Sequence, residues 1–208
     1  MKDLVILVAD KDMEMTMRGL VSRPQSLGIR AIQYDIFTHP HHDPGVRTHA
    51  AEFLRPYHKM YRYALVLFDR EGCGADDMST EEIAQSVQQQ MESAGWQQRC
   101  AVVVIDPELE VWVFSDSPHV AQVIADGDEQ AMRAVLARHT GENRPKPENP
   151  KSAMEEIIRL KKIPRSSALF QRLAEHVSLS RCTDRSFARL RETLKRWFPI
   201  HTGGTNEA

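Results

Sequence analysis

The sequence has few cysteines, no long hydrophobic run and none of the common motifs for nucleotide phosphates. Cys73, Cys100 and Cys182 are scattered and form no CxxC pair, which indicates a reducing compartment and argues against a zinc site. No apolar run approaches the roughly 20 residues that span a bilayer. The short apolar stretch near the N-terminus predicts a first strand rather than a signal peptide. We therefore expect a cytoplasmic protein with no membrane contact.

Several enzyme classes are also disfavoured by what is missing. The chain contains neither GxxxxGK[ST] nor GxGxxG, the glycine-rich loops that cradle nucleotide phosphates. No serine lies in a nucleophile elbow. Cys73 follows acids in a glycine-rich loop, where neighbouring negative charge raises the pKa of a thiol and weakens it as a nucleophile. The remaining candidates for chemistry are carboxylates.

Charge is unevenly distributed over a chain of ordinary composition. The 208 residues are 41% hydrophobic and 27% charged, with a net charge of −2. Residues 1–137 carry 12 Lys and Arg against 21 Asp and Glu, whereas residues 138–208 carry 15 against 8. This asymmetry predicts an acidic metal site beside a basic nucleic-acid surface. Two alternatives are that the halves pack against each other, or that the basic faces are simply solvated.

Three apolar runs each end in acids, at Leu4–Asp12, Ala64–Glu71 and Ala101–Glu110. Runs of this kind, each followed by a helical pattern, predict buried strands of a parallel sheet. Loops at the carboxyl ends of such strands gather at one edge, where ligands bind. The acids expected there are Asp10, Asp12, Asp69, Glu71, Asp106, Glu108 and Glu110. The alternative is that each acid caps the helix that follows it.

The periodicity predicts an α/β fold: a parallel-type sheet of about four strands flanked by helices. Strands are expected at 4–10, 29–37, 63–69 and 100–106. Helices are expected at 12–22, at 48–57 and at 108–115, with a loop at 38–47 before the second of them. A capping box of Ser79 and Glu82 predicts the start of another helix, and two more are expected to start at Ser117 and Asp128. We expect a core at 1–140, a Pro-rich connector at 141–150, a helical segment at 151–200 packed on the core, and a frayed tail from 202.

Asp10 closes the first predicted strand, and Asp69 and Glu71 close the third. Asp69 and Glu71 are two residues apart and project to the same side if the strand continues through them. Clustered carboxylates suit Mg²⁺ or Mn²⁺, and such ions stabilise the attacking and leaving oxygens in phosphoryl chemistry. We therefore predict that Asp10, Asp69 and Glu71 form a metal-binding and catalytic site.

A secondary acidic group contains Asp106, Glu108, Glu110 and Asp116. Glu108 and Glu110 lie about 200° apart on an ideal helix, so both face one site only if the helix starts late. We expect one of them to be structural and to hold a basic residue from the C-terminal helices.

A histidine-rich segment runs from His39 to Asp43. The alternation of His39, His41 and Asp43 suits a metal-binding strand, but Pro40 and Pro44 predict a loop without fixed register. The alternatives are a transition-metal site, a solvated loop, or a loop lining the path of DNA.

The acidic pattern resembles the Toprim fold of topoisomerases, primases and certain nucleases, which has one acid after its first strand and an acid-x-acid pair after its third. More specifically, VADKD, ALVLFDREGCG, VVVIDPELEVWVFSD and LFQRLAEHVSLSRCTDRSF resemble an uncharacterised Toprim-like family of prokaryotic proteins. Its members are often encoded beside ATPases in defence loci, with relatives in methylation-associated antiphage systems. The Toprim first acid is normally Glu and the pair DxD, whereas this chain has Asp10 and DxE.

The resemblance implies that Asp10 assists proton transfer and that Asp69 and Glu71 bind Mg²⁺. It implies an antiviral protein that cleaves DNA or RNA with Mg²⁺ or Mn²⁺. The alternative is a non-catalytic subunit that binds nucleic acid, an ATPase or other subunits of a defence complex; the altered acids favour it. A third option, an acidic mimic of DNA, is disfavoured by the basic C-terminal part.

Overall fold

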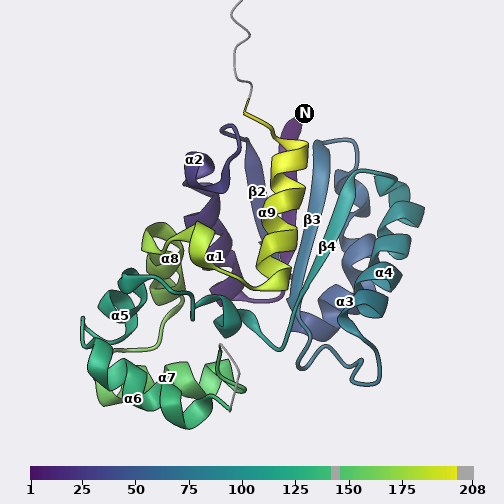
Figure 1. The fold of residues 1–208 in the computed structure, drawn as a ribbon. Coiled ribbons are helices and arrows are strands. Elements are labelled where there is room, and N and C mark those ends of the chain that lie inside the picture. Colours follow the sequence, from purple (N-terminus) through teal and green to yellow (C-terminus); the bar gives the residue numbers. More distant parts are fainter. Residues whose placement is uncertain (142–145, 201–208) are drawn as a thin grey trace, which may run out of the picture.

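The sheet consists of four parallel strands in the order β2-β1-β3-β4 (Figure 1). The computed structural model describes residues 1–141 and 146–200. The strands are β1 (Lys2–Val8), β2 (Tyr34–Thr38), β3 (Tyr61–Asp69) and β4 (Cys100–Ile105). Residues 4–9 are fully buried, as expected for a central strand covered on both faces. The predicted α/β fold with about four parallel strands is confirmed.

Helices cover both faces of the sheet. Figure 1 shows α1 (Lys11–Val21), α8 (Ser167–His176) and α9 (Arg185–Trp197) on one side, and α3 (His42–Leu54) and α4 (Thr80–Met91) on the other. The chain moves outward from β1 to β2, returns past β1 to β3 through α3, and continues through α4 to β4. The direction of winding therefore reverses between β1 and β3, and such a reversal opens a crevice at the carboxyl ends of the strands.

The C-terminal helices pack on the core, as predicted. Helix α9 lies against β4, and Trp197 at its end stacks on Tyr63 of β3 with ring centroids 4.6 Å apart. Helix α8 packs along α1. The remaining helices are α2 (Pro24–Leu27), α5 (Pro118–Ile124), α6 (Glu129–His139) and α7 (Pro150–Leu160). Short turns lie at Arg55–Tyr57, Glu92–Trp96, Leu109–Trp112 (η3) and Leu179–Arg181.

Several predicted starts are confirmed. Ser79 and Glu82 form the expected capping box at α4. Asp128 caps α6 through its side chain, as predicted, and Asp184 caps α9 in the same way. Residues 142–145 of the predicted connector at 141–150 lie outside the described residues, as does the predicted tail from 202, and the last residue of the connector, Pro150, begins α7.

Three predicted boundaries are wrong. Strand β2 starts at Tyr34 instead of Ile29, because its partner β1 begins pairing only at Leu4. Helix α3 starts at His42 instead of Thr48, and Pro44 lies in its first turn, where a backbone N–H has no intrahelical partner to lose. The predicted helix at 108–115 is only the short turn η3.

Within the described residues, no helix combines the length and the apolar character needed to cross a bilayer.

Gly19 provides a test of the α1–α8 packing. A Cβ atom on Gly19 would lie 2.7 Å from Ala174 Cβ and 2.8 Å from the Gln171 carbonyl oxygen. We expect Gly19→Ala to lower the free energy of unfolding by about 1–2 kcal/mol, because overpacking outweighs the gain of about 1 kcal/mol in helix propensity. Urea denaturation measures this change. Arg172→Ala, at an exposed position of α8, should stay within about 0.5 kcal/mol of wild type; a Gly19→Ala protein as stable as wild type would contradict the packing.

Candidate functional site

Three carboxylates converge at the crevice between β1 and β3. Asp10 follows β1, Asp69 is the last residue of β3, and Asp43 lies in the first turn of α3. The two strands are paired up to Val8 and Leu67, so Asp10 and Asp69 leave the sheet side by side. The Asp43 charge raises the pKa of Asp69, and the Asp10 charge raises the pKa of both Asp69 and Asp43. We call Asp10, Asp43 and Asp69 the carboxylate cluster.

Asp69 is the most perturbed member of this cluster. Its Oδ1 atom is buried and has no hydrogen-bond partner among the described residues. Burial raises its pKa well above the usual value, and the charges of Asp43, Glu110 and Asp10 raise it further. The backbone N–H of Leu109 acts in the opposite direction. The protein therefore does not fully offset the cost of burying the negative charge of an ionised Asp69. A bound cation lowers such a cost.

Asp43 joins the site from a segment that was predicted to be a loop. Its Oδ1 accepts a hydrogen bond from the backbone N–H of Asp69 at 2.8 Å. Burial raises the pKa of Asp43, and the Asp10 charge adds to this effect. The sequence reasoning named Asp43 only with the histidines. The available signal was an acid soon after the second strand, placed like Asp10 and Asp69 at a strand's carboxyl end.

Asp10 also performs the structural role that was the alternative interpretation of these acids. Its Oδ1 accepts a hydrogen bond from the Met13 backbone N–H at 2.8 Å and caps α1. The cap orients the carboxylate, because one oxygen is held by the helix end, and the other oxygen has no hydrogen-bond partner within the described part of the chain.

Glu71 differs from the other two predicted ligands in its exposure and in the groups on which its charge acts. It is exposed in the loop after β3, and its backbone N–H donates to the Pro107 carbonyl at 3.0 Å. Its charge raises the pKa of Glu108, whereas the charges that act on Asp69 come from Asp43, Glu110 and Asp10. The structure thus groups Asp10 with Asp69 and places Glu71 toward the secondary acidic group.

Glu108 and Glu110 of the secondary acidic group are buried and form ion pairs with basic residues of the C-terminal part. Such a contact was expected for one of the two. Glu108 precedes η3 and lies 3.7 Å from Lys151 Nζ, while Glu110 lies 3.1 Å from Arg165 Nη2. Burial and the neighbouring Glu110 raise the pKa of Glu108 to about 6. Asp106 and Asp116, in contrast, are exposed. The turn η3 begins only after Glu108, and the charge of Glu110 raises the pKa of Asp69.

The histidine-rich segment is built around one buried ring. His39 is 4% exposed, packs against Phe53, and accepts a hydrogen bond at Nδ1 from the His41 backbone N–H. Burial, followed by the charges of nearby histidines, lowers its pKa. In residues 1–141 and 146–200, no three His, Cys, Asp or Glu side chains are arranged to hold a metal ion as they stand.

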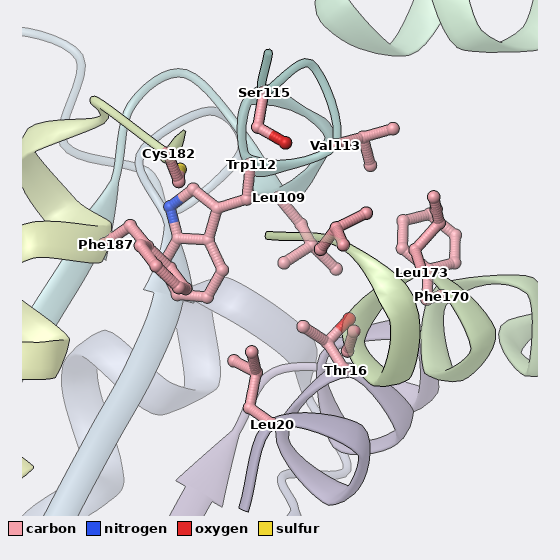
Figure 2. Close-up of a pocket in the computed structure, with 12 residues that line it drawn as sticks. Thr16, Leu20, Leu109, Trp112, Val113, Ser115, Phe170, Leu173, Cys182 and Phe187 are labelled. Atoms are coloured by element: carbon pink, nitrogen blue, oxygen red, sulfur yellow. The ribbon is translucent and has the colours of Figure 1, made fainter. Parts of the chain in front are cut away.

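An apolar cavity lies between α1, η3 and α8 (Figure 2). Its lining includes Leu20, Trp112 and Phe170, together with the Oγ atom of Ser115, which is buried without a partner among the described residues. The cavity has a volume of about 40 Å³. This volume is too small for an organic ligand, since a cavity that binds benzene has about 150 Å³.

The raised pKa of Asp69 has a consequence for stability. A carboxyl whose pKa is higher in the folded state stabilises the protein fully below its unfolded pKa, near 3.8, and this stability is lost as pH rises through the folded pKa. Asp69→Asn removes the buried charge and nearly preserves the shape. Without divalent ions, we expect Asp69→Asn to match wild type near about pH 4 and to be more stable by on the order of 1–3 kcal/mol near about pH 8.

Urea denaturation in EDTA across this range measures the difference. Asp106→Asn is the matched control, because Asp106 is an exposed acid at the end of the neighbouring strand; it should show a difference below about 0.5 kcal/mol. An Asp69→Asn gain that did not grow with pH would contradict the buried charge.

Comparison with known proteins gives a family match over residues 15–195, to a family described as a domain of unknown function, DUF4276. No curated protein and no solved structure gives a significant match. The matched segment contains Asp43, Asp69, Glu110 and Arg165 and begins after Asp10. Because the match covers most of its length, the chain belongs to the DUF4276 family.

Proposed function

We propose that this protein binds a divalent cation, Mg²⁺ or Mn²⁺, at the carboxylate cluster and uses it to cleave phosphodiester bonds of DNA or RNA. The observation that carries the proposal is the buried Oδ1 atom of Asp69, which has no hydrogen-bond partner in the described residues and faces the repulsion of Asp43 and Asp10. A hard cation supplies the missing charge and takes carboxylate oxygens as ligands.

The topology supports a ligand site at the same place. Asp10 and Asp69 end β1 and β3, between which the direction of winding reverses. Ligands of open α/β sheets bind at such reversals. Backbone N–H groups hold one oxygen each of Asp10 and Asp43, an arrangement that orients metal ligands in proteins. A bound divalent ion would stabilise charge on the oxygens of a phosphodiester.

Glu71 remains a predicted ligand of this site. It is exposed and follows Asp69 by two residues, so a rotation of its side chain and loop would be required to bring it to the cluster. Asp43 is the better-placed third carboxylate, because it already contacts the backbone of Asp69.

A non-catalytic role is the second candidate. One oxygen of Asp10 is committed to the cap of α1, and Asp10 is one methylene shorter than the Glu typical of Toprim enzymes. A cluster that binds a cation without turnover would then organise a surface for a partner. On the resemblance alone, we propose a cytoplasmic role in antiviral defence alongside an ATPase or other subunits of a defence complex.

Cation binding is tested by thermal unfolding. A ligand that binds only the native state at 100 times its Kd adds about 2.7 kcal/mol, which raises the Tm of a chain of this size by roughly 5–10 °C. We expect this shift with Mn²⁺ or Mg²⁺ for wild type and for the control Asp106→Ala. We expect it to disappear in Asp69→Ala and to weaken in Asp43→Ala. Equal shifts in wild type and Asp69→Ala would place the cation elsewhere.

Catalysis is tested by incubating the protein with plasmid DNA, single-stranded DNA and RNA in the presence of Mg²⁺ or Mn²⁺. We expect cleavage that Asp69→Ala lowers by at least about 100-fold, since loss of one electrostatic group in an active site typically costs that much. Asp106→Ala should retain the wild-type rate, and Glu71→Ala reports whether Glu71 is a ligand. A saturable Tm shift without cleavage of any substrate would favour the non-catalytic role.

A further inference from the structure

Arg165 bridges the C-terminal helices to the acidic edge of the sheet. It lies between α7 and α8, and its Nη2 atom is 3.0 Å from Asp12 Oδ2 and 3.1 Å from Glu110 Oε1. Glu155 lies farther away, at 3.8 Å from Nε. The guanidinium group also lies 5.6 Å from the centre of the Phe170 ring. Contacts from several elements therefore fix its position.

These contacts leave part of the guanidinium group unused. Nη2 makes the contacts given for both short ion pairs, and Nη1 donates no hydrogen bond within the part of the chain that the structure describes. The side chain is 38% exposed. A planar guanidinium group with a free edge matches the geometry of a phosphate, which it can contact through two parallel hydrogen bonds.

Arg165 is connected to the carboxylate cluster through Asp12, which follows Asp10 by two residues, and through Glu110. The Glu110 carboxylate contacts Arg165, and its charge is one of those that raise the pKa of Asp69. The edge of the sheet is otherwise strongly negative and repels a phosphate. Phosphodiesterases with two metal ions solve this problem by placing positive charge on both sides of the reacting phosphate.

We propose that Arg165 binds a phosphate of the nucleic-acid substrate beside the cation at the carboxylate cluster, and so takes the place of a second metal ion. This inference rests on the proposed function, because it requires a cation at Asp10, Asp43 and Asp69. Asp12 and Glu110 hold the guanidinium group at the rim of the cluster, and its free edge receives the phosphate.

The test measures binding of a labelled single-stranded oligonucleotide to the full chain by fluorescence anisotropy with Mn²⁺, or with Ca²⁺ if the strand is cut. We expect Arg165→Ala to weaken binding at least about 10-fold and Arg165→Lys, which keeps the charge but loses the fork, to weaken it several-fold. Lys151→Ala is the matched control. It removes a cation of the same half that is paired with Glu108, and it should change affinity less than about twofold.

The salt dependence separates phosphate binding from a structural role. Loss of one phosphate contact lowers the slope of log K against log salt by about 0.7 for a single strand. We expect this decrease in Arg165→Ala and not in Lys151→Ala. The Mn²⁺-induced Tm shift should persist in both variants, because neither residue is a cation ligand. If Arg165→Ala does not fold, Arg165→Gln, which removes the charge but keeps most of the side chain, supplies the same comparison.

Each failure has its own signature. The role of Arg165 would be overturned if the folded Arg165 variants bound the oligonucleotide with wild-type affinity and wild-type salt slope. An unchanged Mn²⁺-induced Tm shift in those variants would leave the cation site supported. Absence of the Mn²⁺ shift in wild type would overturn the proposed function, and the role of Arg165 with it.

Discussion

The repulsion among carboxylates at the carboxyl ends of β1 and β3 is the constraint on which the acidic edge of this protein depends. A parallel sheet brings successive strand ends to one edge, and Asp69 at the end of the central strand β3 has one oxygen buried away from water. Backbone N–H groups and basic side chains reduce the resulting cost at Asp10, Asp43, Glu108 and Glu110. The buried oxygen of Asp69 is left without such compensation. The energetic imbalance is therefore local and lies where topology favours a ligand.

The opposite charges of the two halves have a structural meaning. Lys151 and Arg165 from the basic half contact Glu108 and Glu110 of the acidic half. This finding agrees with the interpretation that the halves pack against each other. The two ion pairs account for only part of the excess of Lys and Arg in residues 138–208. Trp112 reinforces the junction, because its Nε1 donates to Ser186 Oγ at 2.7 Å at the start of α9. The acidic edge is thus assembled from both halves of the chain.

The strands and two members of the cluster could be predicted because parallel strands buried on both faces have nearly continuous apolar sequences. Asp10 and Asp69 directly follow such runs, so their position at the edge follows from topology. Asp43 could not be ranked in this way. Its segment contains two prolines, and sequence alone does not distinguish a proline that breaks a helix from one in its first turn. The exposure of Glu71 depends on the conformation of the loop after β3, which strand alternation does not describe.

The hydrogen bond from the Asp69 backbone to Asp43 joins the start of α3 to the end of β3. The chain continues from Asp69 into the exposed loop at 70–78, where the Arg70 side chain donates to the carbonyls of Asp76 and Met78. A displacement of the Asp43 carboxylate changes a bond on the main chain that leads into this loop. The start of this loop is therefore joined through the main chain to the interior of the crevice, and its position depends on the hydrogen bond between Asp43 and Asp69.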